Sequence, residues 1–172
     1  KSFTIQDREY VSGETYKYLG RQYRLKVDDI RGTENVKLKY GYITINTKDK
    51  NNITKKQRLL NEWYKGKSIL IFNEILTSFF PLVKKTIPNL PSIEIKRMSK
   101  RWGSCLKSKN KIILNLELIK ASKHCIEYVV LHELLHFNYR NHNKEFYREL
   151  VVLMPDWKLR KAILDEEIVL YL

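Results

Sequence analysis

The fold of this chain is decided by residues 126–142: Ile-Glu-Tyr-Val-Val-Leu-His-Glu-Leu-Leu-His-Phe-Asn-Tyr-Arg-Asn-His. His132 and His136 are four residues apart, so on an α-helix their imidazoles lie on one face, one turn apart. Glu133 projects about 100° further round the same helix. His142 follows six residues after His136, which lets the chain leave the helix, turn and return a third nitrogen. Three protein nitrogens, an open fourth position and a nearby carboxylate are typical of a hydrolytic zinc site.

We therefore predict that His132, His136 and His142 bind zinc, with another divalent metal as the alternative. Zinc ranks first because it prefers tetrahedral coordination by imidazole. Without a metal, these histidines would be buried in an apolar helix without partners, at a cost of several kcal/mol. Glu133 is the predicted catalytic base: it takes the proton of the metal-bound water as that water attacks a peptide-like bond. A non-catalytic, zinc-stabilised binding module is an alternative that gives Glu133 no such role.

The residues around these histidines predict a buried helix. Between residues 126 and 137, apolar side chains occur on nearly every side of the helix, which indicates burial inside the domain. Ser122 is a plausible N-cap for this helix, and Asn143 can cap the helix that follows. A dry surrounding strengthens electrostatic interactions between a metal and its ligands and excludes stray water.

Composition predicts a soluble enzyme of one domain. An apolar fraction of 43% in 172 residues is enough for a core without a disulfide framework. Cys105 and Cys125 form no Cys-x-x-Cys pair, so a reducing, cytoplasmic setting is expected. The longest apolar run, residues 68–83, is interrupted by Glu74 and Pro81 and is too short and too polar to span a bilayer. We therefore expect no membrane partner.

The pattern of residues 1–52 differs from that of residues 53–172. In the first part, apolar and polar residues alternate, which predicts a small antiparallel β meander with one cationic face, packed on the core. The second part begins with helical periodicity between Thr54, a plausible N-cap, and Pro81, as one long helix or two abutting ones. We predict an α+β fold, with the small antiparallel sheet in residues 1–52 and a helical metal-binding half in residues 53–172.

Positive charge is concentrated before the histidines. The net charge is +14, yet residues 121–172 are close to neutral. Residues 96–111 contain seven cations and no acid, between two predicted strands that form a hairpin, with a Gly103-Ser104 turn in its basic tip. Such a field favours an anionic or peptide substrate, or a nucleotide or nucleic acid. The candidate substrate-binding residues are Arg101, Lys107, Lys109, Lys111, Tyr139 and Arg140.

Several separate motifs resemble those of the YgjP-like metallopeptidase-domain family, in the same order and at similar spacing. They are Arg101-Trp102-Gly103-Ser104-Cys105, Ile113-Leu114-Asn115-Leu116 with Leu118, Tyr128 to His136, His142 with Phe146, and Pro155-Asp156. Tyr18-Leu19-Gly20-Arg21-Gln22-Tyr23 is similar to the opening strands of that family. The resemblance implies a zincin-like domain in which the three histidines are ligands and Glu133 is the base. One departure is Asn143, where serine is expected; both residues cap helices.

The resemblance leaves the substrate open. It implies a metallopeptidase, and UTP pyrophosphohydrolase activity on the same metal site has also been associated with the family. A DNA-associated protease is a third alternative, because WLM-type proteases share the three-histidine spacing. A metzincin protease is not expected, because Tyr139 stands where metzincins have glycine. Candidates for stabilising the charge that develops on the substrate oxygen are Arg101, Tyr128, Tyr139 and Arg140.

Overall fold

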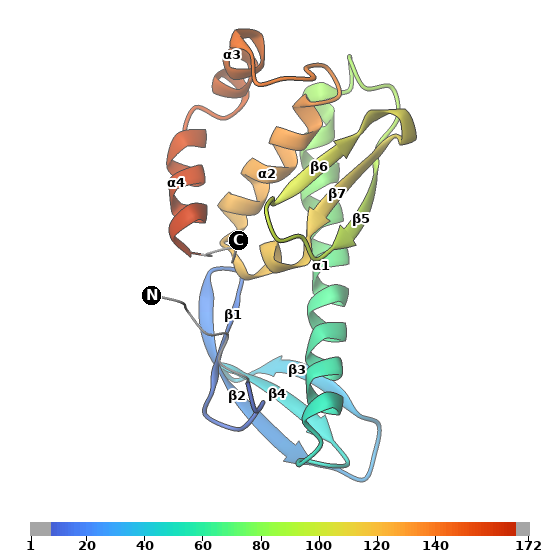
Figure 1. The fold of residues 1–172 in the computed structure, drawn as a ribbon, viewed down its shortest axis with the longest axis vertical. Helices are drawn as coiled ribbons and strands as arrows, with labels where there is room; N and C mark the ends of the chain where they lie inside the picture. The colour runs from blue at the N-terminus through green and yellow to red at the C-terminus, as the bar shows by residue number, and fades with distance from the viewer. Residues whose placement is uncertain (1–7, 168–172) are drawn as a thin grey trace. The chain divides into compact units, whose positions relative to one another are not determined.

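The structure is a computed structural model that describes residues 8–167. Within residues 15–47, where apolar and polar side chains alternate, the chain forms a four-stranded sheet (Figure 1). The strands are β1 (Thr15–Tyr18), β2 (Arg21–Asp29), β3 (Asn35–Lys39) and β4 (Tyr42–Thr47), in the order β1-β2-β4-β3. The chain divides into two compact units, one formed by residues up to 17 with 22–64, the other by residues 18–21 with those from 65 onward. The ends of the predicted ranges, residues 1–7 and 168–172, lie outside the described residues.

The sheet of the first unit is mixed, so the predicted antiparallel meander is wrong in its pairing. β3 and β4 form the expected antiparallel hairpin, whose turn residues Tyr40 and Gly41 both have positive φ. β2, however, pairs with β4 in parallel. Alternation of side chains shows which face of a strand is buried, but it does not say which strand lies next to it. Leu25, Ile43 and Ile45 form the buried face.

The second unit contains a three-stranded sheet in the order β5-β7-β6. Its strands are β5 (Ser92–Lys96), β6 (Gly103–Leu106) and β7 (Lys111–Asn115). The predicted hairpin between β5 and β7 is wrong, because these two strands pair in parallel. Gly103 and Ser104 do not form a turn; they begin β6, which pairs with β7 in antiparallel fashion. A short 3-10 helix, η1 (Lys107–Lys109), joins β6 to β7, and Asn110 ends it in the left-handed conformation.

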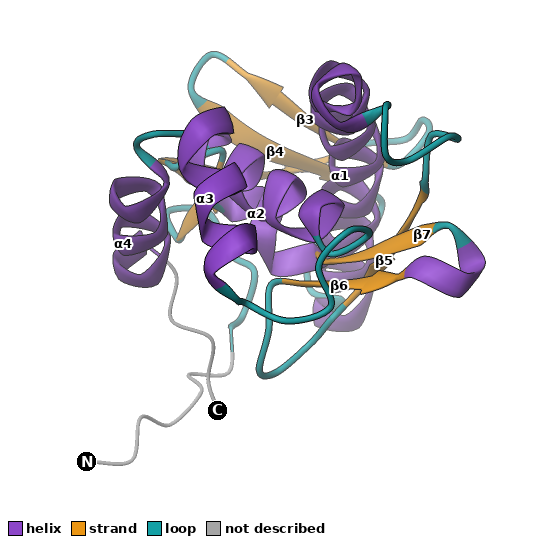
Figure 2. Cartoon of the chain, turned by 90° about the horizontal axis from the view of Figure 1, so that it is seen from above, coloured by secondary structure: helices purple, strands orange, loops and turns teal. Residues whose placement is uncertain are grey.

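Helix α2 (Lys123–Leu135) carries the first predicted metal ligand, His132, into the second unit, and the second ligand, His136, is its C-cap residue. It contacts β6, α3 (Lys144–Leu153) and α4 (Trp157–Glu167). Figure 2 shows α2 with the small sheet on one side and α3 and α4 on the other. The all-round apolar pattern is thus explained by packing on all sides, and the α+β class is confirmed.

Helix α1 (Ile53–Val83) is one continuous helix, which settles the choice between one helix and two. Its N-cap is Asn52 rather than Thr54, because the Asn52 side chain accepts a hydrogen bond from the Lys55 amide at 2.9 Å. Among residues 8–167 it is the one helix that is long and apolar enough to cross a membrane. However, Phe72 and Leu76 on its second half are buried in the core of the second unit. These buried residues place the second half of α1 in the core of that unit, and the cytoplasmic location stays a prediction.

Asn115, at the end of β7, anchors residues 98–102, the segment that leads into β6, by hydrogen bonds. Its fully buried side chain donates to the carbonyl oxygens of Met98 at 2.7 Å and Arg101 at 3.0 Å. The same side chain accepts from the Glu117 amide at 3.1 Å and caps the 3-10 helix η2 (Leu116–Lys120). The backbone amide of Asn115 donates to the Trp102 carbonyl at 2.9 Å. Residues 98–102 therefore have a fixed path although they form no regular element.

We expect Asn115→Ala to lower the free energy of unfolding by about 3 kcal/mol, because two carbonyls and one amide lose a buried partner. Asn73→Ala is the matched control: the exposed Asn73 amide donates only within α1, to the Ile69 carbonyl, so a change within about 0.5 kcal/mol is expected. Urea unfolding of the metal-free proteins measures both. Equal effects of the two substitutions would contradict the anchoring role of Asn115.

Candidate metal centre

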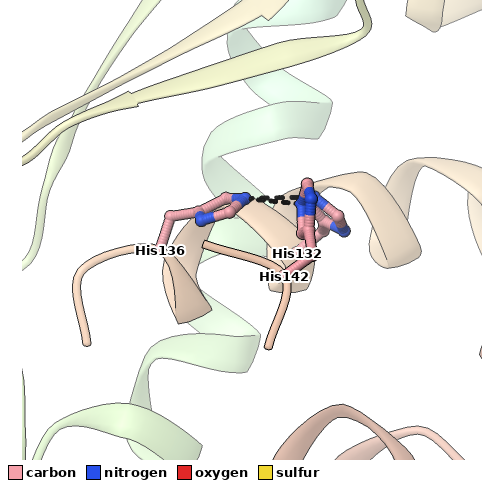
Figure 3. A group of neighbouring side chains, drawn as sticks. All are labelled: His132, His136 and His142. Atoms are coloured by element: carbon pink, nitrogen blue, oxygen red, sulfur yellow. Dashed lines mark hydrogen bonds between the residues drawn. The ribbon is translucent and has the colours of Figure 1, made fainter. Parts of the chain in front are cut away.

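The three predicted ligands bring their Nε2 atoms together at one point (Figure 3). His132 lies in the last turn of α2, His136 caps the end of that helix, and His142 follows in the loop before α3. The Nε2–Nε2 distances are 3.2 Å between His132 and His136, 3.0 Å between His136 and His142, and 2.9 Å between His132 and His142. Nitrogens that share one tetrahedral zinc ion lie about 3.3 Å apart, given zinc–nitrogen bonds of about 2.0–2.1 Å.

Hydrogen bonds alone cannot account for this triangle of nitrogens. Each neutral Nε2 carries either a hydrogen or a lone pair, so at least one side of any triangle joins two donors or two acceptors. Nδ1 of His136 lies 2.8 Å from the carbonyl oxygen of Tyr139, to which it donates, so Nε2 of His136 carries a lone pair. A cation at the centre would accept all three lone pairs. The donor set therefore fits a divalent metal.

Phe146 packs against all three imidazoles, a role that the sequence did not suggest. Its ring centroid lies 5.0 Å from the ring centroids of His132, His136 and His142 alike. Asn143 positions it, because its side chain accepts from the Phe146 amide at 2.9 Å and caps α3, as predicted. The ring is fully buried. Its position four residues after the third histidine is a sequence signal from which this packing role could have been predicted.

Burial keeps the imidazoles of His132 and His142 neutral. It lowers the pKa of His132 to about 3, with a further contribution from His136 and His142. Burial is also the first cause that lowers the pKa of His142. Neutral imidazole is the form that binds metals. His132 and His142 therefore keep the form that binds metals below the ordinary pKa of histidine.

Glu133 is buried against the first residue of β6. Its side chain is 6% exposed, and its carboxylate lies beside the Cα of Gly103. Desolvation raises the pKa of Glu133 to about 8, although the nearby guanidinium of Arg101 opposes the shift. In the metal-free site this shift keeps the carboxyl group protonated at neutral pH, and a cation held by the histidines would favour the ionised form that can act as a base.

The histidines and Glu133 line a cleft of about 1210 Å³ in the second unit. All four residues of β6 line it too, as does Tyr128 of α2. The Tyr128 hydroxyl lies 3.4 Å from Nδ1 of His132, and burial raises the pKa of Tyr128 above its usual range. Tyr128 therefore stays protonated at neutral pH and can donate a hydrogen bond into the cleft.

The cleft separates the predicted substrate-binding residues into two groups. Arg101, Lys107 and Arg140 line it, and so does Lys100, which the sequence did not single out. Lys109 does not line it, and Lys111 instead pairs with Glu94 at 2.9 Å. These four cleft cations form no ion pair within residues 8–167, and Glu133 is the only acid in the lining.

Two further cations of the basic tract, Lys96 and Arg97, pair with carboxylates from its flanks. Lys96 pairs with Glu94 at 2.8 Å and Arg97 pairs with Glu117 at 3.1 Å. Tyr139, a further substrate candidate, does not line the cleft, and its hydroxyl bonds the side chain of Glu149. Lys109, Lys111 and Tyr139 thus lie outside the lining of the cleft, and a role for them in substrate binding stays a prediction.

In the metal-free protein, the buried Glu133 makes stability fall as the pH rises. The unfolded chain releases this proton near pH 4.5, whereas the folded protein holds it until about pH 8, so rising pH favours unfolding across that interval. His132 acts in the opposite sense between about pH 3 and 6.5. Below pH 6.5 the lowered pKa values of His132 and His142 oppose the effect of Glu133, and of these three groups only Glu133 acts from pH 6.5 to 8.

We expect Glu133→Gln to stabilise the metal-free protein more at pH 8 than at pH 5.5, by an extra amount of up to a few kcal/mol. Melting temperatures measured after treatment with a chelator test this difference. Parallel pH curves for the wild type and the Gln variant would show that Glu133 is not the group responsible.

Comparison with solved structures finds two similar archaeal metallopeptidase zymogens. Jannalysin of Methanocaldococcus jannaschii is 26% identical, and the match covers 58% of this chain and 94% of that chain with a TM-score of 0.45. Abylysin of Pyrococcus abyssi is 18% identical, with 55% and 90% covered and a TM-score of 0.45. Comparison with curated proteins gives no significant match. The model of the YgjP-like metallopeptidase domain matches residues 2–167, and this chain therefore belongs to the YgjP-like metallopeptidase-domain family, a family of metal-dependent hydrolases.

Proposed function

We propose that the protein is a zinc-dependent hydrolase of peptide-like bonds. The observation that carries the proposal is the convergence of three imidazole Nε2 atoms within 3.2 Å of one another, in a cleft that also contains the buried Glu133. His132, His136 and His142 would hold the metal, and their all-nitrogen set favours zinc, with another divalent metal as the alternative. When bound, zinc would polarise the substrate carbonyl and acidify the attacking water.

Glu133 is the proposed general base. It would take one proton from the attacking water while the water oxygen bonds to the carbonyl carbon. As the carbon–nitrogen bond breaks, the same carboxyl group would pass that proton to the leaving nitrogen. Its position in the lining of the cleft, next to His132 in sequence, suits both steps. Tyr128, Arg101 and Arg140 line the cleft and are the candidates for donating to the carbonyl oxygen as its charge develops.

An extended peptide could bind along β6. This strand pairs with β7 on one side only, and its residues line the cleft, so its other edge offers backbone hydrogen bonds to a peptide strand. β7 offers no such edge, because it lies between β5 and β6.

The charge of the cleft favours acidic substrates. Lys100, Arg101, Lys107 and Arg140 form no ion pair within residues 8–167, and they face a single buried acid. A peptide with acidic side chains flanking the bond to be cut would be attracted to them, whereas a basic peptide would be repelled. The same four cations could bind a triphosphate, so hydrolysis of UTP to UMP and pyrophosphate is the second candidate function. The DNA-associated protease and the non-catalytic module stay hypotheses.

We expect the zinc-loaded wild type to cleave quenched fluorogenic peptides and Glu133→Gln to lose at least about 100-fold in kcat, because a general base contributes 10²–10⁴-fold. Zinc content, measured by elemental analysis, should stay at one ion per chain in the Gln variant. His136→Ala should lose both zinc and activity. Full activity of Glu133→Gln would contradict the proposed role of Glu133 and favour a binding module.

Charge reversal tests the substrate class. Lys100→Glu/Lys107→Glu should raise the KM for a peptide with acidic flanking residues by about tenfold, because two attractive charges become repulsive. Lys109→Glu is the matched control, since Lys109 belongs to the same tract but does not line the cleft. UTP is assayed in parallel: turnover of UTP without any peptide cleavage would favour the second candidate. An equal effect of the control and the double variant on KM would contradict a role for the cleft cations.

A further inference from the structure

Gly103 lies where a side chain would collide with the proposed catalytic base. A Cβ atom placed on Gly103 would be 2.8 Å from both Cγ and Oε1 of Glu133 and 3.0 Å from its Cδ. Contacts of that length are shorter than van der Waals contact between such atoms, so a side chain at position 103 would force some group to move. The carboxylate of Glu133 thus occupies the space that any other residue at position 103 would fill.

The backbone conformation at position 103 does not require glycine. Glycines 13, 20 and 41 all have positive φ, the region that favours glycine, but Gly103 does not. Gly103 begins a regular antiparallel strand and pairs with Leu114. An alanine would adopt this conformation without strain. The reason for glycine at this position is therefore the space that it leaves.

At the contact between Gly103 and Glu133, neither the backbone of β6 nor that of α2 is free to move away. On one side, the path of β6 is fixed by its pairing with the buried Leu114 and by the hydrogen bonds of Asn115 to the residues before it. On the other side, α2 is packed against β6, α3 and α4. The side chain of Glu133 is the part that can move, by changing its rotamer towards the cleft. A residue larger than glycine at position 103 would thus displace the carboxylate rather than the two backbones.

We propose that Gly103 is a positioning residue of this site: the absence of a side chain above its Cα gives the carboxylate of Glu133 its place beside the three histidines. The kinetic consequence rests on the proposed function, in which Glu133 is the general base. The structural consequence, a displaced carboxylate, does not depend on it. Gly103 itself supplies no reacting group.

Crystal structures of the metal-free wild type and of Gly103→Ala test the structural part. We expect the Glu133 carboxylate of the variant to move by about 1 Å or more while the three imidazoles stay in place. Gly66→Ala is the matched control, because a Cβ on Gly66 in α1 meets no atom within 4 Å. An unmoved carboxylate in Gly103→Ala would overturn the proposal.

Kinetics with a quenched peptide that carries acidic flanking residues tests the consequence. Gly103→Ala should lower kcat by about 100-fold with KM within about twofold, since a 1 Å misplacement of a catalytic group can cost that much. In the Glu133→Gln background the same change should cost less than about threefold, because the base is already absent. Equal losses in both backgrounds would assign Gly103 a merely structural role and overturn the proposal.

Two further results distinguish a failure of the proposed function from a failure of the positioning role of Gly103. If the wild type cleaves no peptide, the proposed function fails, and the crystal structures alone decide whether Gly103 positions the carboxylate. If Gly103→Ala does not fold, Gly103→Ala/Glu133→Ala removes the colliding atoms and should fold. Failure of this double variant to fold would show that the collision is with another group, and the proposal would be overturned.

Discussion

The constraint on which the second unit depends is the close approach of three imidazole nitrogens that cannot all be hydrogen-bonded to one another. Nε2 atoms 2.9–3.2 Å apart form a triangle of donors and acceptors with at least one mismatched side. The surrounding packing maintains this arrangement. Phe146 contacts all three rings, the Tyr139 carbonyl orients His136, and α2 is held by elements on all sides. Such a preorganised set of lone pairs is what a divalent cation requires.

The buried groups and the exposed cations lie in different parts of the cleft. Glu133 lies in the buried wall formed by α2, beside the half-buried His132, and desolvation raises the pKa of Glu133 but lowers that of His132. The unpaired cations lie on the segment before β6, on η1 and in the loop after α2, where they are exposed. A buried wall suits proton transfer, whereas an exposed cationic rim suits attraction of a substrate from solution. β6 joins the two, because it begins beside Glu133 and ends next to Lys107.

Much of the site could be predicted from the sequence because its signals are local. The spacing of His132 and His136 on one helix, the return of His142 and the cap at Asn143 are set within 20 residues. Strand pairing could not be predicted in the same way. The parallel pairing of β5 with β7, and the strand β6 where a turn was expected, depend on contacts between segments distant in sequence. For the same reason, the neutralisation of Lys111 by Glu94 and the contact of Gly103 with Glu133 could not be inferred from sequence patterns.

The most direct test of metal binding is a crystal structure determined from data collected on both sides of the zinc absorption edge, on protein purified without a histidine tag. We expect one anomalous difference peak, about 2.0–2.1 Å from each Nε2 of His132, His136 and His142. The peak should be present above the edge and absent below it. No peak between the three imidazoles in crystals grown with added zinc, or a zinc ion bound by other residues, would contradict the metal centre.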